Sequence, residues 1–213
     1  MLEIELTTEQ AQRAGSRSAL YRLLARGFAF PTVELYEVVR GGRYRAQALE
    51  AARGLAYRLE VPDPLGQGMN GPCEDFQSLY MALFEVGGPE GPPVPLHEGH
   101  YGGGHLRDME EVLRLYHHFG LRYAGDFRPD HLQTELEFMH ALTFAEAAGL
   151  ERRDAAEVYA RAEADFLRYH LRGLAQAVDQ GFGGRGASFY PDLARLVAAF
   201  VEADIGALAE RGP

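Results

Sequence analysis

The sequence predicts an all-α protein, folded as a single bundle-like domain of about eight helices. Apolar residues recur at three- and four-residue spacing along most of the 213-residue chain, as in helices that bury one face. No segment shows the sustained alternation of a half-buried strand. Apolar residues make up 46% of the chain, which is enough for one sizeable core.

Capping residues, prolines and glycines bound the expected helices. Thr7 and Gln10 form a capping-box pattern at the start of the first helix, and Pro31 ends that helix. Thr32 caps the second helix, and Pro129 suits the first turn of the sixth. We expect helices over residues 8–30, 33–39, 43–60, 73–86, 105–119, 129–148, 152–179 and 191–209.

Two long connections are the expected mobile elements. Segment 87–104 contains seven glycines and four prolines, so we expect no regular structure in it. Loops of this length in a compact domain are usually functional or mobile. The second element is the connection 121–131, which leads into the helix that begins at Pro129.

Charge and composition exclude several classes of function. The net charge is −10, which opposes binding to nucleic acid or anionic lipid and favours cationic partners such as a basic peptide. All 21 basic residues are arginine, so no lysine Schiff base or P-loop lysine can form. Cys73 is the single cysteine, which excludes an intramolecular disulfide and a thiolate metal cluster.

The N-terminus and the hydropathy pattern point to the cytoplasm. The first ten residues, MLEIELTTEQ, are acidic and lack the basic and apolar regions of a signal peptide. No window approaches the 18 uncharged apolar residues of a membrane span. We therefore expect a cytoplasmic protein with no stable membrane insertion.

The stretch RPDHLQTELEFMHAL (128–142) carries the best candidate for metal chemistry. Glu137 and His140 form an E-x-x-H pair, but a helical di-iron site needs a second such pair, which is missing. Three loop histidines suggest a zinc site, although the simpler interpretation is that they are ordinary polar residues of a loop. The alternative function, a helical metal-dependent enzyme, would draw its ligands from 97–140: His97, His100, His131, Glu137 and His140.

Nucleophilic and nucleotide-binding motifs are absent. No G-x-S-x-G sequence accompanies the serines, so no residue is predicted to be catalytic. The glycines at 102–104 precede a helix, but they follow no predicted strand and no Walker lysine accompanies them. A helix-entry loop is the simpler interpretation of this triplet.

Two separated motifs resemble one protein family. YMALFEVG matches a Y-x-x-L-F-x-x-G pattern, and FRPDHL matches most of an E-x-P-D-H-L pattern. In this order they resemble the redox-enzyme maturation chaperones of the trimethylamine-oxide, dimethyl-sulfoxide and nitrate reductase assembly type. The flanking helices agree with the family as well, so the resemblance covers about residues 16–205.

The resemblance implies a non-enzymatic, all-helical chaperone in the cytoplasm. Members bind the N-terminal, often twin-arginine, segment of an apo molybdopterin-containing catalytic subunit and hold the subunit until its cofactor is inserted. The resemblance implies no cofactor beyond weak guanine nucleotide binding in some members. It also implies a hinge near 121–131 between an N-terminal lobe, 1–120, and a C-terminal lobe, 129–213. The long loops fit either a monomer or a domain-swapped dimer.

The two motifs supply the candidate client-binding residues. For Phe84, packing in the core is as good an interpretation as contact with a client. For Asp130 and His131, capping a helix and locking the hinge is as good an interpretation as contact with a client. The family's glutamate falls on Phe127 here, with Asp126 beside it, and the chain has no tryptophan to line a groove. The candidates are Tyr80, Leu83, Phe84, Gly87, Asp126, Pro129, Asp130 and His131.

Overall fold

A computed structural model describes residues 5–66, 69–89, 91–101, 105–122, 128–183 and 188–211, with the backbone alone for 105–108. The predicted all-α class is confirmed: these residues form helices, no strand and two isolated β-bridges. The helices are α1 (Glu9–Gly27), α2 (Val33–Arg40), α3 (Arg43–Arg53), α4 (Cys73–Tyr80), η1 (Met81–Glu85), η2 (Glu98–His100), α5 (His105–His118), α6 (Leu132–Arg152), α7 (Ala156–Phe166), η3 (Leu167–Leu171), α8 (Arg172–Gly181) and α9 (Phe189–Glu210).

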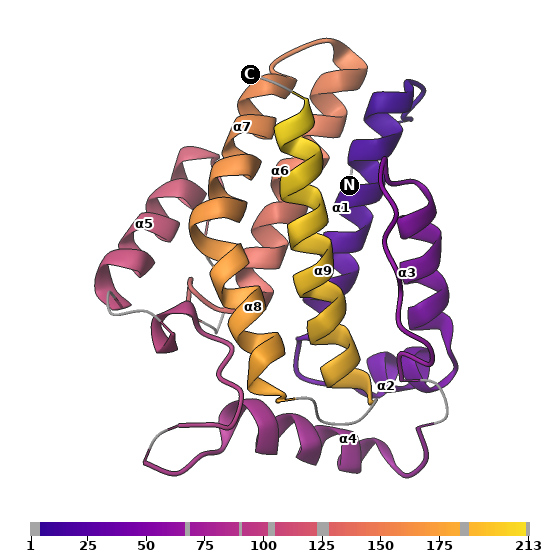
Figure 1. The fold of residues 1–213 in the computed structure, drawn as a ribbon, viewed down its shortest axis with the longest axis vertical. Helices are drawn as coiled ribbons and strands as arrows, with labels where there is room; N and C mark the ends of the chain where they lie inside the picture. Colours follow the sequence, from indigo (N-terminus) through magenta and orange to yellow (C-terminus); the bar gives the residue numbers. More distant parts are fainter. Residues whose placement is uncertain are drawn as a thin grey trace.

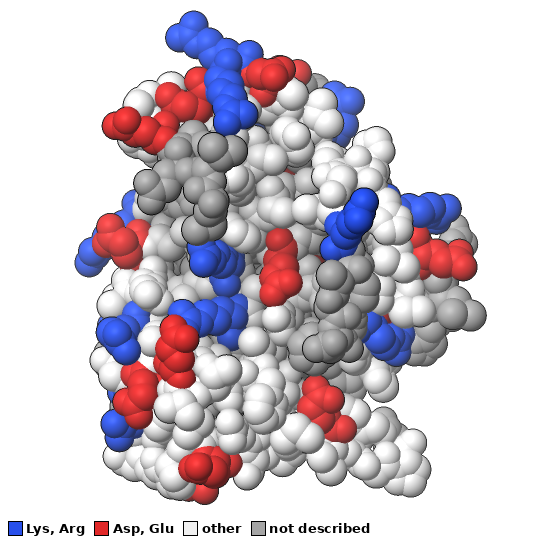
Figure 2. Space-filling model, turned by 180° about the vertical axis from the view of Figure 1, so that it is seen from behind, with Lys and Arg blue, Asp and Glu red and all other residues white. Residues whose placement is uncertain are grey.

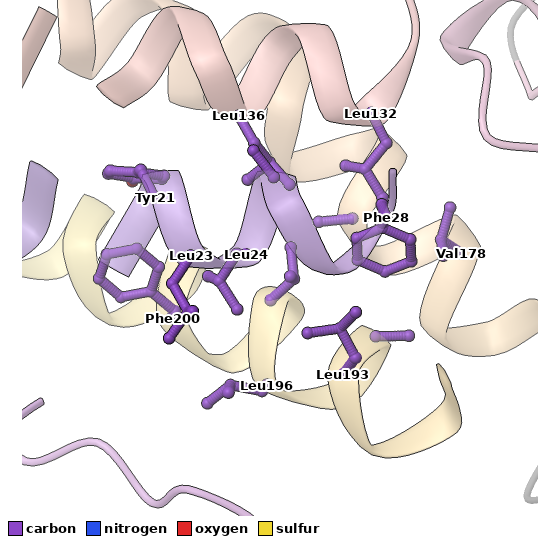
Figure 3. Packing of buried hydrophobic residues seen from close by; sticks show 14 of the residues in the cluster. Tyr21, Leu23, Leu24, Phe28, Leu132, Leu136, Val178, Leu193, Leu196 and Phe200 are labelled. Carbon is purple, nitrogen blue, oxygen red and sulfur yellow. The ribbon is translucent and has the colours of Figure 1, made fainter. Parts of the chain in front are cut away.

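The long helices form a bundle, and shorter helices cover its end and sides. Figure 1 shows α1, α6, α9 and the continuous rod α7–η3–α8 running along the long axis, with α4 lying across one end and α5 beside α7. In Figure 3, side chains from α1, α6, α8 and α9 meet in the core, including Phe28, Leu136, Val178 and Phe200. No described helix has the length and hydropathy needed to cross a bilayer.

The start of α1 differs from the prediction by one residue. Thr8, not Thr7, is the N-cap, and its hydroxyl accepts a hydrogen bond from Ala11 N (3.2 Å). Thr7 instead donates its backbone N–H to Glu151, near the end of α6 (2.9 Å). The local pattern predicted the helix start, and the structure places the cap one residue later.

The third helix is shorter than predicted, because it ends at Arg53 rather than at residue 60. A Cβ at Gly54 would lie 2.1 Å from Ser16 Oγ, so glycine lets the chain approach α1 closely without displacing Ser16. Beyond this point Tyr57 turns inward and donates a hydrogen bond to Asp204 (2.9 Å). Packing against α1 and α9 therefore overrides the helical propensity of 54–60.

The later helix boundaries also shift. The sixth helix starts at Leu132, not at Pro129, and runs through Gly149 to Arg152. A Cβ at Gly149 would meet Asp154 O at 2.4 Å, so this glycine permits a tight corner instead of ending the helix. The next rod begins at Ala156 rather than 152, and the last helix begins at Phe189 rather than 191.

A buried ion cluster joins four helices of the bundle. Arg17 on α1 is 1% exposed, and it donates from Nε to Asp204 (2.6 Å) and from Nη1 to Glu146 (2.7 Å). Its Nη2 donates to Glu163 and to the second oxygen of Asp204 (2.9 Å). Tyr21 also donates to Asp204 (2.7 Å). We call Arg17, Glu146, Glu163 and Asp204 the Arg17 cluster; no sequence motif predicted it.

Candidate functional site

The glycine-rich loop pairs with the start of α6. His97 and His131 form an antiparallel bridge. Glu98 N donates to Asp130 O (2.9 Å), and Leu132 N donates to Leu96 O (2.8 Å). The expectation of no regular structure in 87–104 is therefore wrong for this part of the loop, which also contains the short helix η2. The pairing brings loop residues against Pro129, Asp130 and His131.

Asp130 is the most heavily bonded residue of this junction. It is fully buried, and its Oδ2 accepts hydrogen bonds from Gly99 N (3.1 Å) and Arg128 Nη2 (3.0 Å). Burial alone would raise the pKa of this carboxyl, but His97, the Gly99 amide and the charge of Arg128 together lower it below its ordinary value. Since His97 Nδ1 lies 3.6 Å from Oδ1, too far for a hydrogen bond, we attribute the net lowering mainly to Gly99 and Arg128. Asp130 is thus an anion that ties the loop to α6.

His131 caps α6 from a buried position. Its Nδ1 accepts a hydrogen bond from Gln133 N (3.1 Å). Burial and the nearby His97 lower the pKa of His131 to about 3, against the opposing effect of Asp130. The ring is therefore neutral at physiological pH and suited to accept. Next to it, the carbonyl of Pro129 accepts from Tyr116 OH on α5 (3.0 Å).

Glu135, one turn into α6, is the residue that the motif analysis missed. It is fully buried, and among the described residues neither carboxyl oxygen has a hydrogen-bond partner. Burial, followed by the charges of Glu98 and Asp130, raises its pKa well above the usual range. Its spacing four residues after His131 placed it on the right face, but only the fold showed the burial. We call Glu98, Asp130, His131 and Glu135 the junction cluster.

Glu98 links this cluster to the rod α7–η3–α8. Its Oε2 lies 3.3 Å from His170 Nδ1 on η3. The His170 ring in turn lies against Phe166, with centroids 5.2 Å apart. The loop therefore touches two helices, α6 through Asp130 and η3 through Glu98.

The first motif lies in the core, where α4 closes the end of the bundle. Tyr80 and Phe84 are 1% and 4% exposed, and both contact the ring of Tyr190. Tyr80 OH donates to Phe28 O (3.2 Å), and Leu83 O accepts from Val94 N (3.0 Å). Core packing, the alternative weighed for Phe84, describes its position here. Contact of these residues with a client stays a prediction.

Two candidate residues remain, Gly87 in the loop and Asp126. Gly87 is exposed, and a Cβ on it would lie 1.8 Å from Gly91 O, so the turn after η1 requires glycine. Asp126, together with Phe127, lies outside the described residues. Within the predicted hinge, 121–131, the structure therefore describes only residues 121–122 and 128–131.

The ligands of the metal-dependent alternative lie apart. The rings of His97 and His131 are 4.9 Å apart, whereas His140 lies nine residues further along α6, about 13 Å by helix rise. His140 Nδ1 lies 2.8 Å from Ser18 Oγ. In the part of the chain that the structure describes, no group of three or more His, Cys, Asp or Glu side chains is arranged to hold a metal ion. The geometry gives this alternative no support.

Two surface features complete the site's surroundings. On the face seen in Figure 2, acidic and basic side chains are interspersed over a mainly uncharged surface, so the excess acid forms no continuous patch there. A cleft of about 510 Å³ lies between α5 and the rod α7–η3. Figure 1 shows these helices at the edge of the bundle. The cleft borders the junction cluster, because one of the residues that line it, His170, contacts Glu98.

Known proteins resemble this chain along most of its length. The profile of the nitrate reductase delta subunit family matches residues 43–177. The perchlorate reductase assembly chaperone protein of Dechloromonas aromatica (strain RCB) is 32% identical over 213 residues, covering 96% of this chain and 95% of that protein. The selenate reductase assembly chaperone protein of Thauera selenatis is 36% identical over 137 residues, 59% of this chain and 68% of the relative.

A third relative is named for a dehydrogenase rather than for a reductase. The dimethyl sulfide dehydrogenase assembly chaperone protein of Rhodovulum sulfidophilum is 32% identical over 170 residues, 73% of this chain and 64% of the relative. The resemblance carried by the two motifs is therefore confirmed. The chain belongs to the nitrate reductase delta subunit family of redox-enzyme maturation chaperones.

Proposed function

We propose that this protein is an assembly chaperone for the catalytic subunit of a molybdopterin-containing oxidoreductase. The observation that carries the proposal is the near full-length similarity to an assembly chaperone, at 32% identity over 96% of the chain. The relatives are named for three reductases and one dehydrogenase, so the client is either type of enzyme. The protein acts on the apo subunit, in the cytoplasm, before cofactor insertion.

The finer part of the proposal is that the chaperone binds the N-terminal, twin-arginine-type segment of this subunit. A net charge of −10 favours a partner that carries arginines. Arg–carboxylate contacts are charge-assisted and can be bidentate, which suits recognition of such a segment. Binding delays export or assembly until the cofactor is in place.

The junction cluster supports a mobile element in this mechanism. The loop is held to α6 by the pair of backbone hydrogen bonds at the bridge and by the contacts of Asp130. Opening the junction would expose the Asp130 and Glu135 carboxyls and bring Tyr80, Leu83 and Phe84 nearer to solvent. The candidate contacts Pro129, Asp130 and His131 are part of this proposal, as are the two lobes on either side of the hinge.

Isolation of the tagged chain from its host tests the function. We expect mass spectrometry to show enrichment of a molybdopterin oxidoreductase catalytic subunit that lacks its cofactor. In a strain without the chaperone, that subunit should still be made, but with less molybdenum and less activity. The proposal fails if no such subunit is enriched.

Elemental analysis of the purified chain addresses the rival function. Stoichiometric iron, manganese or zinc in the protein would favour the metal-dependent enzyme. Size measurement of the same sample distinguishes the monomer from the domain-swapped dimer.

A further inference from the structure

The cleft beside the junction has two helical walls. One wall is α5 and the residue after it, through Leu115 and Phe119, and the other is α7–η3, through Ala162 and Phe166. Phe166 is buried, whereas Leu115, Phe119 and Ala162 are half-buried, so an apolar floor is accessible between the helices. A volume of about 510 Å³ is enough for several side chains of a bound segment.

Exposed apolar side chains extend this floor to the surface. Val158 is 56% exposed and Tyr169 is 68% exposed, and both line the cleft. Val158, Ala162 and Phe166 follow one another at four-residue spacing, so they form a continuous apolar row along α7. An accessible apolar row at the edge of a cleft is the feature expected of a docking surface.

Acidic side chains flank the row on both walls. Glu111 lies on α5, and Glu157 and Asp165 lie on α7. All three are exposed, and none of them makes an ion pair or side-chain hydrogen bond with another described residue. The only arginine lining the cleft among the described residues is Arg161, so the walls carry a net negative charge.

We propose that this cleft is the docking site for the client's N-terminal segment, a partner with neighbouring arginines and an adjoining apolar stretch. The inference rests on the proposed function and adds the surface that performs the capture. Neighbouring residues of an extended chain point to opposite sides, so one arginine meets Glu111 on α5 and the other meets Glu157 or Asp165 on α7. The apolar stretch covers Val158 and Tyr169.

Two observations favour this occupant over others. A second copy of the chain carries the same net charge of −10, so its approach to acidic walls is opposed. An anionic membrane is opposed for the same reason. Tyr80 and Phe84 of the first motif are buried, so they offer a client little accessible surface in this structure.

The test measures binding of one peptide to matched variants by calorimetry. The peptide is the N-terminal segment of the catalytic subunit that co-purifies with the chaperone. Glu157→Arg with Asp165→Arg should weaken binding about tenfold or more, because attraction becomes repulsion at two positions. Glu5→Arg with Glu210→Arg changes the net charge equally at exposed positions outside the cleft, and should change affinity less than about twofold.

A second pair of variants tests the apolar row. Val158→Ser should weaken binding several-fold, roughly as expected for losing two buried methyl groups. Val33→Ser is its control, because Val33 is 65% exposed on α2, away from the cleft. These side chains are exposed, so each variant is expected to fold, and circular dichroism checks that it does.

The outcomes separate this inference from the proposed function. Unchanged affinity of both cleft variants, with loss of binding on Asp130→Ala, would overturn the cleft and leave the chaperone function intact. A wild-type dimer that the cleft variants dissociate would assign the cleft to a second copy and also overturn the inference. Co-purification of no molybdopterin oxidoreductase subunit would remove both.

Discussion

Acidic side chains are buried in two clusters, and the two clusters differ in the hydrogen-bond donors that these side chains have. In the Arg17 cluster, one guanidinium donates to three carboxyl groups from α6, α7 and α9. In the junction cluster, Asp130 has donors, but Glu135 is fully buried with both oxygens unpartnered among the described residues. The first arrangement fixes helices against one another, whereas the second leaves polar groups that another structure could satisfy better.

The difference lies in what each cluster connects. The Arg17 cluster joins long helices whose apolar faces already pack together, so charge pairing adds to a rigid core. The junction cluster joins a loop of eleven described residues, 91–101, to a helix start, and Val94 and Leu96 are the only buried apolar side chains among these eleven residues. Regions of this kind open at lower free energy than a core does. We therefore expect motion at the junction and not at the Arg17 cluster.

The largest expected effect comes from removing the central cation. Arg17→Met removes the buried cation that Glu146, Glu163 and Asp204 share, and should lower the free energy of unfolding by about 3–5 kcal/mol. Chemical denaturation measures this loss. Arg22→Met is the control, because Arg22 is exposed on the same helix and should change stability little. A loss below about 1 kcal/mol would show that the cluster does not hold the bundle.

Asp130→Ala should have the next largest effect. It leaves the Gly99 amide without its acceptor, at a cost of about 1–3 kcal/mol in the free energy of unfolding. Amide hydrogen exchange should rise at residues 96–101 before it rises in the bundle. If Asp130 also pairs with a charged group of the client, peptide affinity should fall by about 1–3 kcal/mol. Unchanged affinity in a folded variant would leave Asp130 with a structural role alone.

Glu135→Leu should stabilise the protein, by about 1–2 kcal/mol near neutral pH, because it replaces a buried carboxyl that has no hydrogen-bond partner among the described residues. Since the pKa of Glu135 is raised in the folded state, the folded protein keeps a proton that the unfolded chain releases above pH 4.5. Glu135 should therefore make the wild type less stable as pH rises above this value, and the variant should show a shallower slope. Part of the slope should remain, because burial also raises the pKa of Glu163, to about 8.

Denaturation at pH 5 and pH 8 checks this prediction. Glu137→Leu is the matched control, because Glu137 is exposed on the same helix. An equal effect of Glu135→Leu at both pH values would contradict the buried, proton-retaining carboxyl. Destabilisation by Glu135→Leu would indicate that Glu135 has a polar partner.

The smallest effect is expected for an arginine–glutamate pair that is exposed to solvent. Arg172 donates to Glu202 from two nitrogens, at 2.6 and 3.0 Å, but both side chains are partly in solvent. Arg172→Ala should change the denaturation midpoint only slightly, and added salt should remove what difference there is. A loss comparable to that of Arg17→Met would show that burial is not the cause of the contrast.

Helix positions were predictable where local signals set them. Thr32 caps the second helix in the structure, as its position in the sequence predicted. The conformation of residues 54–60 and the start of α6 could not be predicted from local signals. Tyr57 is held by Asp204, and Pro129 is held by Tyr116. Local pattern carries no information on partners that far along the chain.

The candidate site was predicted in part. Asp130 and His131 were singled out from their motif, and the fold brings them against His97 and Glu98. Glu135 and the cleft residues Glu157 and Asp165 carried no motif. Their significance lies in burial or in the lack of a partner, and neither property can be inferred from residue spacing alone.

The sequence by itself determined the all-α class, the family and the residues at the loop–helix junction, because periodicity, capping residues and short motifs are local properties. Only the tertiary structure decided that Tyr80 and Phe84 are buried, that Arg17 binds carboxyl groups on three helices and that Glu135 has no hydrogen-bond partner within the described part of the chain. Each of these depends on which surfaces meet when the helices pack, and packing joins residues more than a hundred positions apart, such as Arg17 and Asp204.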